Sequence, residues 1–170
     1  MSLVLDGSNG ITAPVGAVYN GIQSGTAVAS TSGTSIDFTS IPSWVKRVTV
    51  MLAGVSTNGS SSPIVQLGAG SVTTSGYVSE VQFSSTASAF TTGFGLANSI
   101  GAANLIGGSV TICLLGSNTW VESGNIISAN NVVFVSGGYI ALSGTLTTVR
   151  ITTVNGTDTF DAGSINILYE

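Results

Sequence analysis

Short apolar runs separated by turn-forming residues, roughly one run every ten positions, limit what this chain can fold into more than any other feature. In residues 44–55 the aliphatic side chains Val48, Val50 and Leu52 occupy every second position. This period of two predicts a strand with one apolar face turned toward a core. Helix-forming residues such as Glu, Lys, Gln and Met are scarce, whereas Val, Ile, Thr and Gly abound. The chain is therefore predicted to be all-β.

Further strand candidates follow along the chain at uneven spacing. They are residues 35–38, 64–67, 77–83, 90–96, 110–115, 119–122, 132–135, 139–142, 146–154 and 164–169. Gly137-Gly138 and Asn155-Gly156 predict tight hairpin turns, because these residues accept a positive φ at low cost. Without a fixed repeat, many short strands favour a two-sheet antiparallel β-sandwich, jelly-roll-like, over a solenoid. We assign residues 33–170 to this single domain.

Residues 1–32 differ from the rest, since they mix small residues and Pro14 with isolated large apolar side chains. Such a segment buries little surface by itself, so it is either a mobile tail or an extended N-terminal arm that docks on another subunit or particle protein. A pure linker has no need of apolar side chains whose burial releases about 1.5 to 3 kcal/mol each. We favour the docking arm, with Leu3, Val4, Leu5 and Ile11 as its docking residues.

Charge is nearly absent. The chain has 3 Lys+Arg and 7 Asp+Glu, a net charge of −4, and charged residues are 6% of the total against about 25% in an ordinary domain. Three cations cannot neutralise a nucleic-acid backbone or make a basic membrane-surface helix. The mean hydropathy is +0.53, yet the apolar runs are far shorter than a membrane-spanning helix, and no signal peptide is visible. We expect neither nucleic-acid binding nor membrane insertion. With so little repulsion between copies, we expect a homo-oligomer.

Histidine is absent and cysteine occurs once, which excludes Ser-His-Asp and Cys-His catalysis and the common zinc sites. Cys113 lies in an apolar run, where we expect it buried and unreactive. A glycoside hydrolase remains an alternative, because such enzymes use paired carboxylates and the chain has Glu122, Asp158 and Asp161. An irregular calcium site is a second alternative, in the oxygen-rich residues 155–161. Turn capping is the favoured role of the two aspartates. We therefore expect no catalytic residues, no cofactor and no metal site.

Three sequence blocks resemble a known family. They are IDFTSIPSWVKRVTVM at residues 36–51, GVSTNG at 54–59 and VRITTVNGTDTFDAGSINI at 149–167. Together they resemble small virion proteins of tailed bacteriophages, usually described as tail-fibre or related structural proteins. The opening LVLDGSNG at residues 3–10 also resembles the start of phage fibre and capsid-attached proteins. Residues 60–130 resemble the family in composition only.

The resemblance implies a non-enzymatic component of the virion that forms a homo-oligomer, most simply a trimer. In that arrangement the arm binds other virion proteins, and the β domain faces outward toward a host cell-surface glycan or protein. A capsid decoration protein, such as a cement or head-fibre protein, is the alternative, and a polysaccharide depolymerase is the third reading. The resemblance carries over no catalytic residues.

Two loops are candidates for the outward tips of such a domain, because they are small, polar and uninterrupted by core residues. They span residues 58–63 and 84–89. Many weak contacts made by such tips would add up through avidity in an oligomer. The residues that we expect at the tips are Asn58, Gly59, Ser60, Ser84 and Ser85.

Overall fold

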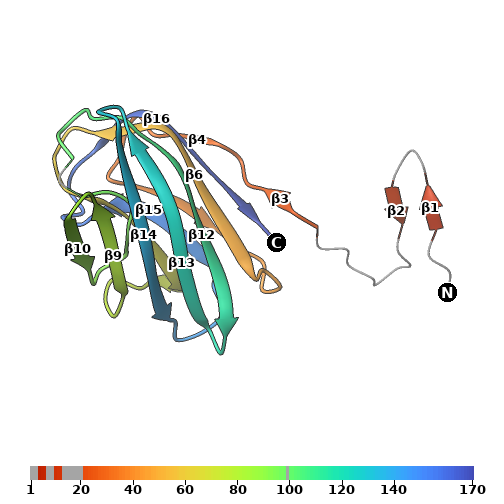
Figure 1. The fold of residues 1–170 in the computed structure, drawn as a ribbon. Coiled ribbons are helices and arrows are strands. Elements are labelled where there is room, and N and C mark those ends of the chain that lie inside the picture. The colour runs from red at the N-terminus through yellow and green to blue at the C-terminus, as the bar shows by residue number, and fades with distance from the viewer. Residues whose placement is uncertain (1–3, 7–9, 13–20, 99) are drawn as a thin grey trace.

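A computed structural model describes residues 4–6, 10–12, 21–98 and 100–170, and every regular element in these residues is a β-strand (Figure 1). This confirms the all-β prediction. The strands are β1 (Val4–Asp6), β2 (Gly10–Thr12), β3 (Gln23–Ser24), β4 (Val28–Ala29), β5 (Ser35–Thr39), β6 (Arg47–Thr57), β7 (Pro63–Ala69), β8 (Ser71–Val72), β9 (Val78–Phe83), β10 (Thr86–Phe90), β11 (Phe94–Gly95), β12 (Ile106–Gly116), β13 (Thr119–Ser128), β14 (Val132–Ala141), β15 (Thr148–Thr153) and β16 (Phe160–Tyr169).

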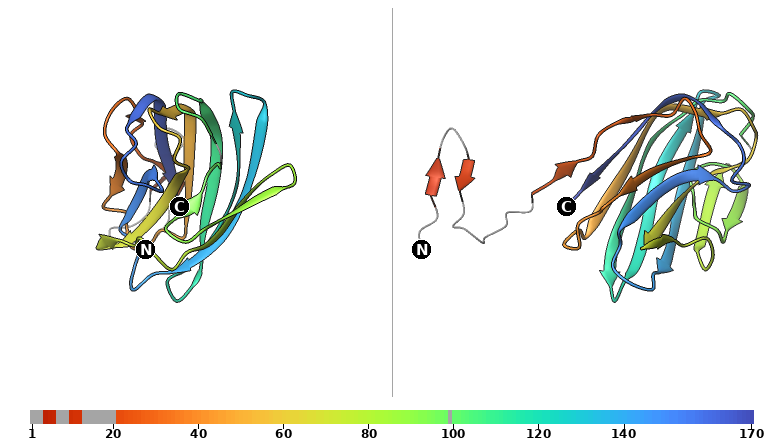
Figure 2. Two further views of the ribbon diagram at one scale, coloured as in Figure 1. Left: turned by 90° about the vertical axis from the view of Figure 1, so that its left-hand side faces the viewer. Right: turned by 180° about the vertical axis from the view of Figure 1, so that it is seen from behind.

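Two antiparallel sheets form the body of the molecule. The larger has nine strands in the order β10-β9-β14-β13-β12-β6-β16-β3, with β4 also paired to β16. The smaller has five strands in the order β11-β7-β15-β5, with β8 added on β7. Figures 1 and 2 show the small sheet lying behind the large one, so that the predicted sandwich-like arrangement is present.

The core lies between the two sheets. On β6 the predicted inward row is confirmed, since Val48, Val50 and Leu52 are all buried. Val149 and Ile151 on β15 of the small sheet are fully buried and belong to the same apolar cluster. Because each such side chain contributes about 1.5 to 3 kcal/mol when removed from water, the apolar residues that both sheets bury stabilise the sandwich without any disulfide.

The hairpin predicted at Gly137-Gly138 is wrong, because both glycines lie inside the single long strand β14. Gly138 pairs with Glu122 on one side and with Ser79 on the other. A Cβ at Gly138 would lie 2.6 Å from the backbone oxygen of Val78. This glycine therefore allows a close approach between β14 and β9, which a sequence reading cannot distinguish from a turn.

Two further local predictions need correction. Asn155-Gly156 does form a turn, with φ +67° at Gly156, but the strands on either side, β15 and β16, lie in different sheets and do not form a hairpin. The strand predicted at residues 90–96 is reduced to β11, because the chain leaves the large sheet after β10 and crosses to the small one. Both errors arise because local turn chemistry does not say which sheet the chain enters next.

The segment before β5 follows the edge of the large sheet. Gly25 N–H donates to the Ile167 carbonyl, and Ser30 N–H donates to the Gly163 carbonyl. Residues 21–32, which the sequence reading placed in the arm, thus run along β16. Of the predicted docking residues, Leu3 lies outside the described residues, whereas Val4 and Leu5 in β1 and Ile11 in β2 belong to a separate two-stranded sheet.

Candidate functional site

A groove of about 490 Å³ lies where the two predicted tip loops approach each other. One wall comes from the connection between β6 and β7, and the other from β10 and the residues that follow it. Its lining is rich in hydroxyl groups: Ser60, Ser61, Ser62, Ser88, Ala89, Phe90, Thr91, Thr92, Asn98 and Val154. This volume is within the range of small-molecule sites. Of the predicted tip residues, only Ser60 lines the groove.

The loop at residues 58–62 is held in place rather than free. The Asp158 carboxylate accepts hydrogen bonds from Ser61 N–H at 2.9 Å and from the Asn155 side-chain amide at 2.6 Å. Asn58 exchanges two further bonds with Thr159, one through its backbone N–H and one through its side-chain oxygen. The predicted tip residues Asn58 and Gly59 therefore pack on the connection between β15 and β16, and this contact positions the groove wall.

Removing the Asp158 carboxylate should loosen this wall. We expect Asp158→Ala to destabilise the protein by about 1 to 2 kcal/mol, because two charge-assisted hydrogen bonds are lost. Amide hydrogen exchange at Ser61 should become faster, since its acceptor is gone. Asp37→Ala is the control, because its ion pair with Arg150 is partly exposed and should contribute less than about 1 kcal/mol. Unchanged exchange at Ser61 would contradict the positioning role of Asp158.

The second predicted tip is a hairpin turn rather than a loop. Residues 86–89 belong to β10, which pairs with β9, and only Ser84 and Ser85 form the turn between them. Ser84 has φ +53°, as tight turns require. Both serines are exposed, but they do not line the groove.

Asn98 is a groove residue that the sequence analysis missed. It is 4% exposed, and its amide nitrogen donates to the Ser88 hydroxyl at 2.9 Å. Its side-chain oxygen has no hydrogen-bond partner among the described residues. A buried polar atom without a partner is costly. The sequence does carry one clue, because Asn98 directly follows the apolar Leu96-Ala97, where a polar residue interrupts core-forming positions.

The outward face of the large sheet is the second notable surface. Its middle strands β9, β14 and β13 expose six large apolar side chains, including Val135 at 54% and Tyr139 at 52%. Cross-strand pairing sets Val121, Tyr139 and Val78 in one row and Ile127 beside Val133 in another. Contiguous apolar patches of this kind mark interaction sites on soluble proteins. A period of two predicts only one apolar side per strand. An exposed apolar face is predictable only where apolar residues occupy both sides of a strand, as they do on β14.

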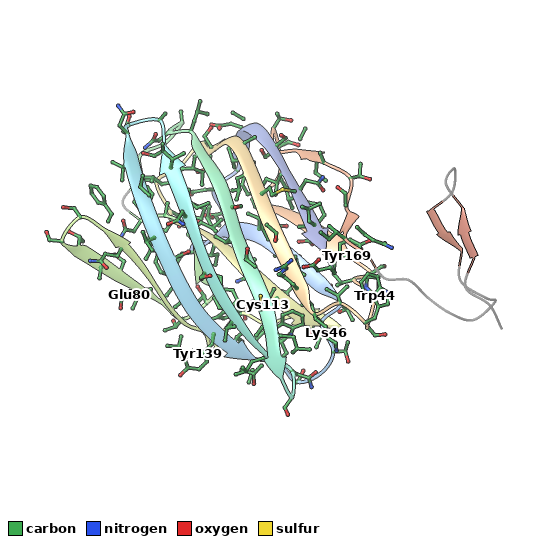
Figure 3. All side chains as sticks on the ribbon, turned by 45° about the vertical axis from the view of Figure 1, so that its right-hand side comes forward. Trp44, Lys46, Glu80, Cys113, Tyr139 and Tyr169 are labelled. Carbon is green, nitrogen blue, oxygen red and sulfur yellow. The ribbon has the colours of Figure 1, made fainter. Side chains whose placement is uncertain are left out.

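Charges lie at the two sides of this face and not in its middle. Figure 3 shows Glu80 on the β9 side and Lys46 at the β6 side, with Cys113 between them on β12. Arg47 forms an ion pair with Glu170. Within the part of the chain that the structure describes, Lys46 and Glu80 have no ion-pair partner. Cys113 is half-buried on this face, so the prediction that it lies in the core is wrong.

Glu122 lies in the core. It is 5% exposed on the inner side of β13, where one carboxylate oxygen accepts the Ser136 hydroxyl at 2.7 Å and the other has no partner among the described residues. Burial raises the pKa of Glu122 to about 7, and the Ser136 hydrogen bond offsets part of that rise. Asp158 and Asp161 instead hold loop and strand groups: Asp158 binds Ser61 N–H, and Asp161 accepts the Ser56 hydroxyl. The carboxylates therefore sit in different environments.

The described residues contain neither a metal-binding cluster nor a membrane-spanning helix. Among those residues no group of three or more His, Cys, Asp or Glu side chains could hold a metal ion. In the same ranges no helix is long and apolar enough to cross a membrane. Comparison with known proteins also gives no match: no family model fits the chain, and no curated protein or solved structure is significantly similar to it.

Proposed function

We propose that the chain is a non-enzymatic structural protein of a bacteriophage virion that assembles as a homotrimer. In this proposal the N-terminal arm attaches the trimer to other virion proteins. The sandwich, which we regard as jelly-roll-like, faces outward for host attachment, as a tail fibre or fibre-like adhesin does. The observation that carries the assembly is the apolar outward face of the large sheet. The virion role rests on the sequence resemblance.

The size of that face fits an interface between copies. Six neighbouring strands form the body of the large sheet, in the order β9, β14, β13, β12, β6 and β16. Strands about 4.8 Å apart and about ten residues long give a face of roughly 900 Å². A stable protein interface needs about 800 Å² from each partner. One sheet face therefore has about the area of one such contact, which the two neighbours in a ring would share.

The charges favour a second copy as the partner. Glu80 and Lys46 lie on opposite sides of the same face, and neither has an intrachain ion-pair partner among the described residues. If the β9 side of one copy meets the β6 side of the next, Glu80 of one approaches Lys46 of the other. Contacts of this head-to-tail kind close into a ring when the rotation allows it. Three copies form the ring in this proposal.

The jelly-roll-like description and the arm have separate support. The chain crosses between the sheets repeatedly, from β5 to β6, from β6 to β7 and from β15 to β16, as double-sheet jelly rolls do. The small sheet of β1 and β2 precedes the sandwich and is hydrogen-bonded within itself. A short isolated hairpin is marginally stable in water, which favours a partner for this segment.

Native mass and particle incorporation test the proposal. We expect light scattering to give about 51 kDa, three times the 16.9 kDa of one chain. Deleting residues 1–20 should leave a folded trimer that no longer joins particles, because β3 and β4 on β16 are retained. A monomer at micromolar concentration would refute the assembly. Incorporation of the truncated chain would refute the docking role of the arm.

A capsid decoration protein is the second candidate, because the same apolar face could pack on a capsid surface as well as on a second copy. Labelling the protein on intact particles separates the two. Copies at the tail or at fibre tips support the adhesin, and copies spread over the head, without binding to host cells, support decoration.

A further inference from the structure

We infer that the groove between β10 and the residue 58–62 loop binds an uncharged saccharide. This inference deepens the proposed attachment role, since it names the chemical class of the host ligand and the place where it binds. It rests on that role for its biological setting only. The geometry that carries it, from Asn98, the hydroxyl walls and the apolar floor, is independent of how the copies assemble.

Asn98 provides the first argument. Its side chain is at least nine-tenths buried and lines the groove, and its oxygen has no partner in the described residues. Its amide nitrogen donates to the Ser88 hydroxyl and to the Val81 carbonyl, so turning the amide over would place the oxygen against a carbonyl that cannot donate to it. The oxygen itself is closed off from solvent beneath the groove lining, so a ligand hydroxyl can donate to it only when that lining opens slightly. No donor of the described residues replaces the hydrogen bonds to water that this oxygen loses on burial, so its burial lowers the stability of the folded protein.

The chemistry of the walls gives the second argument. Serine and threonine residues line both walls of the groove, and its lining contains no Asp, Glu, Lys or Arg. Hydroxyls both donate and accept, so they match the polyhydroxylated rim of a sugar ring but offer little to a charged ligand. The exposed Val154, with the small accessible part of Phe90, adds apolar surface on which the C–H face of a pyranose could pack. Such a mixture of apolar contact and a few placed polar groups is typical of small-ligand sites.

The groove is also organised before any ligand arrives. Ser61 is held twice, since its N–H donates to Asp158 and its hydroxyl accepts Asn155 N–H at 3.0 Å. The opposite wall is a strand of the large sheet, where β10 pairs with β9. Walls fixed by hydrogen bonds reduce the entropy lost on binding, which matters most for weakly bound ligands such as sugars.

An extended peptide is the competing occupant, because β10 is the last strand of the large sheet and its outer edge could accept another strand. Peptide pairing would use the β10 backbone and would not need the Asn98 oxygen or the serines of the opposite wall. The presence of hydroxyl residues on both walls therefore favours the saccharide.

Saturation-transfer difference NMR on the full-length protein tests the inference, with glucose, galactose, rhamnose and N-acetylglucosamine as separate probes. We expect at least one sugar to bind. In a separate amide correlation spectrum of the protein, we expect the shift changes that this sugar causes to map to residues 60–62, 88–92 and 98. Ser60→Trp should fill the groove and weaken binding at least tenfold. Ser60 is exposed, so this variant should fold normally. Asn98→Leu, which removes the free acceptor, should weaken binding to a similar degree.

Ala87→Trp is the matched control, since Ala87 is an exposed residue on β10 that does not line the groove, and its sugar binding should stay unchanged. The inference is overturned if none of the sugars binds, if the shifts map elsewhere, or if Ser60→Trp and Ala87→Trp behave alike. Strand addition by a peptide that resists Asn98→Leu would overturn it in favour of the competing occupant. Trimer mass and particle incorporation do not depend on the groove, so failure here leaves the proposed assembly intact.

Discussion

A Val135→Asp chain is expected to be monomeric under conditions in which the unaltered chain is trimeric. Val135 lies in the middle of the outward face, between Asn125 and Gln82 on the neighbouring strands, and is 54% exposed in the single chain. In the assembled protein an aspartate here would be buried without a cation. Such a charge costs about 3 kcal/mol or more, which corresponds to about a hundredfold weaker association. Light scattering across a dilution series measures the change.

The control for this variant is Ser71→Asp, which adds the same charge at an exposed position of β8 on the small sheet. Its mass should equal that of the unaltered chain. The Val135→Asp monomer should also keep its β-rich circular dichroism spectrum, because the side chain points away from the core. A trimer that persists in Val135→Asp would show that the outward face is not the interface.

Replacing Glu122 by Gln is expected to stabilise the protein at pH 8 by about 3 kcal/mol and to have little effect at pH 4. Burial raises the pKa of Glu122 to about 7 in the folded protein, from 4.5 in the exposed state. Between these values the folded state holds the proton more tightly than the unfolded state. The stability of the unaltered protein therefore falls as the pH rises from 4.5 to 7 and is level above that window.

Glutamine stays neutral at every pH and can still accept the Ser136 hydroxyl, so the variant should lose this part of the pH dependence. Urea unfolding at a series of pH values measures it, at constant protein concentration because assembly also contributes to stability. Glu80→Gln is a suitable control, because it removes the same charge from an exposed position. It is made in the Val135→Asp background, so that Glu80 stays exposed in a monomer, and it should not change the pH dependence of stability between pH 4.5 and 7. A constant difference between Glu122→Gln and its parent from pH 4 to pH 8 would contradict a buried, titrating Glu122.

The strands with strict alternation were predictable, and those with special glycines were not. Val48, Val50 and Leu52 identified β6 because the side-chain period of a strand is two wherever one face is buried. Gly137-Gly138 misled the reading because glycine serves both tight turns and close strand contacts, and only the packing of β9 against β14 tells them apart. The sheet to which β15 and β16 belong is likewise a long-range choice.

The candidate groove was predictable in part. Residues 58–62 of the expected loop do form the connection between β6 and β7, whereas Pro63 begins β7 and is buried, and Ser60 lines the groove. The partners of that loop could not be foreseen, since Asp158 is about a hundred positions away and Asn98 comes from a third segment. Hydrogen bonds between distant segments depend on the packed chain, and a single sequence carries little information about them.

The sequence by itself determined that the chain is all-β, poor in charge and free of histidine chemistry, because these properties follow from residue types and from a two-residue period. Only the tertiary structure decided which apolar side chains remain exposed. Val133 and Phe134 are neighbours in one apolar run, yet Phe134 is buried between the sheets while Val133 faces outward. The physical reason is that a strand must turn every second side chain away from its own core, and an apolar residue there is covered only when another surface packs on it.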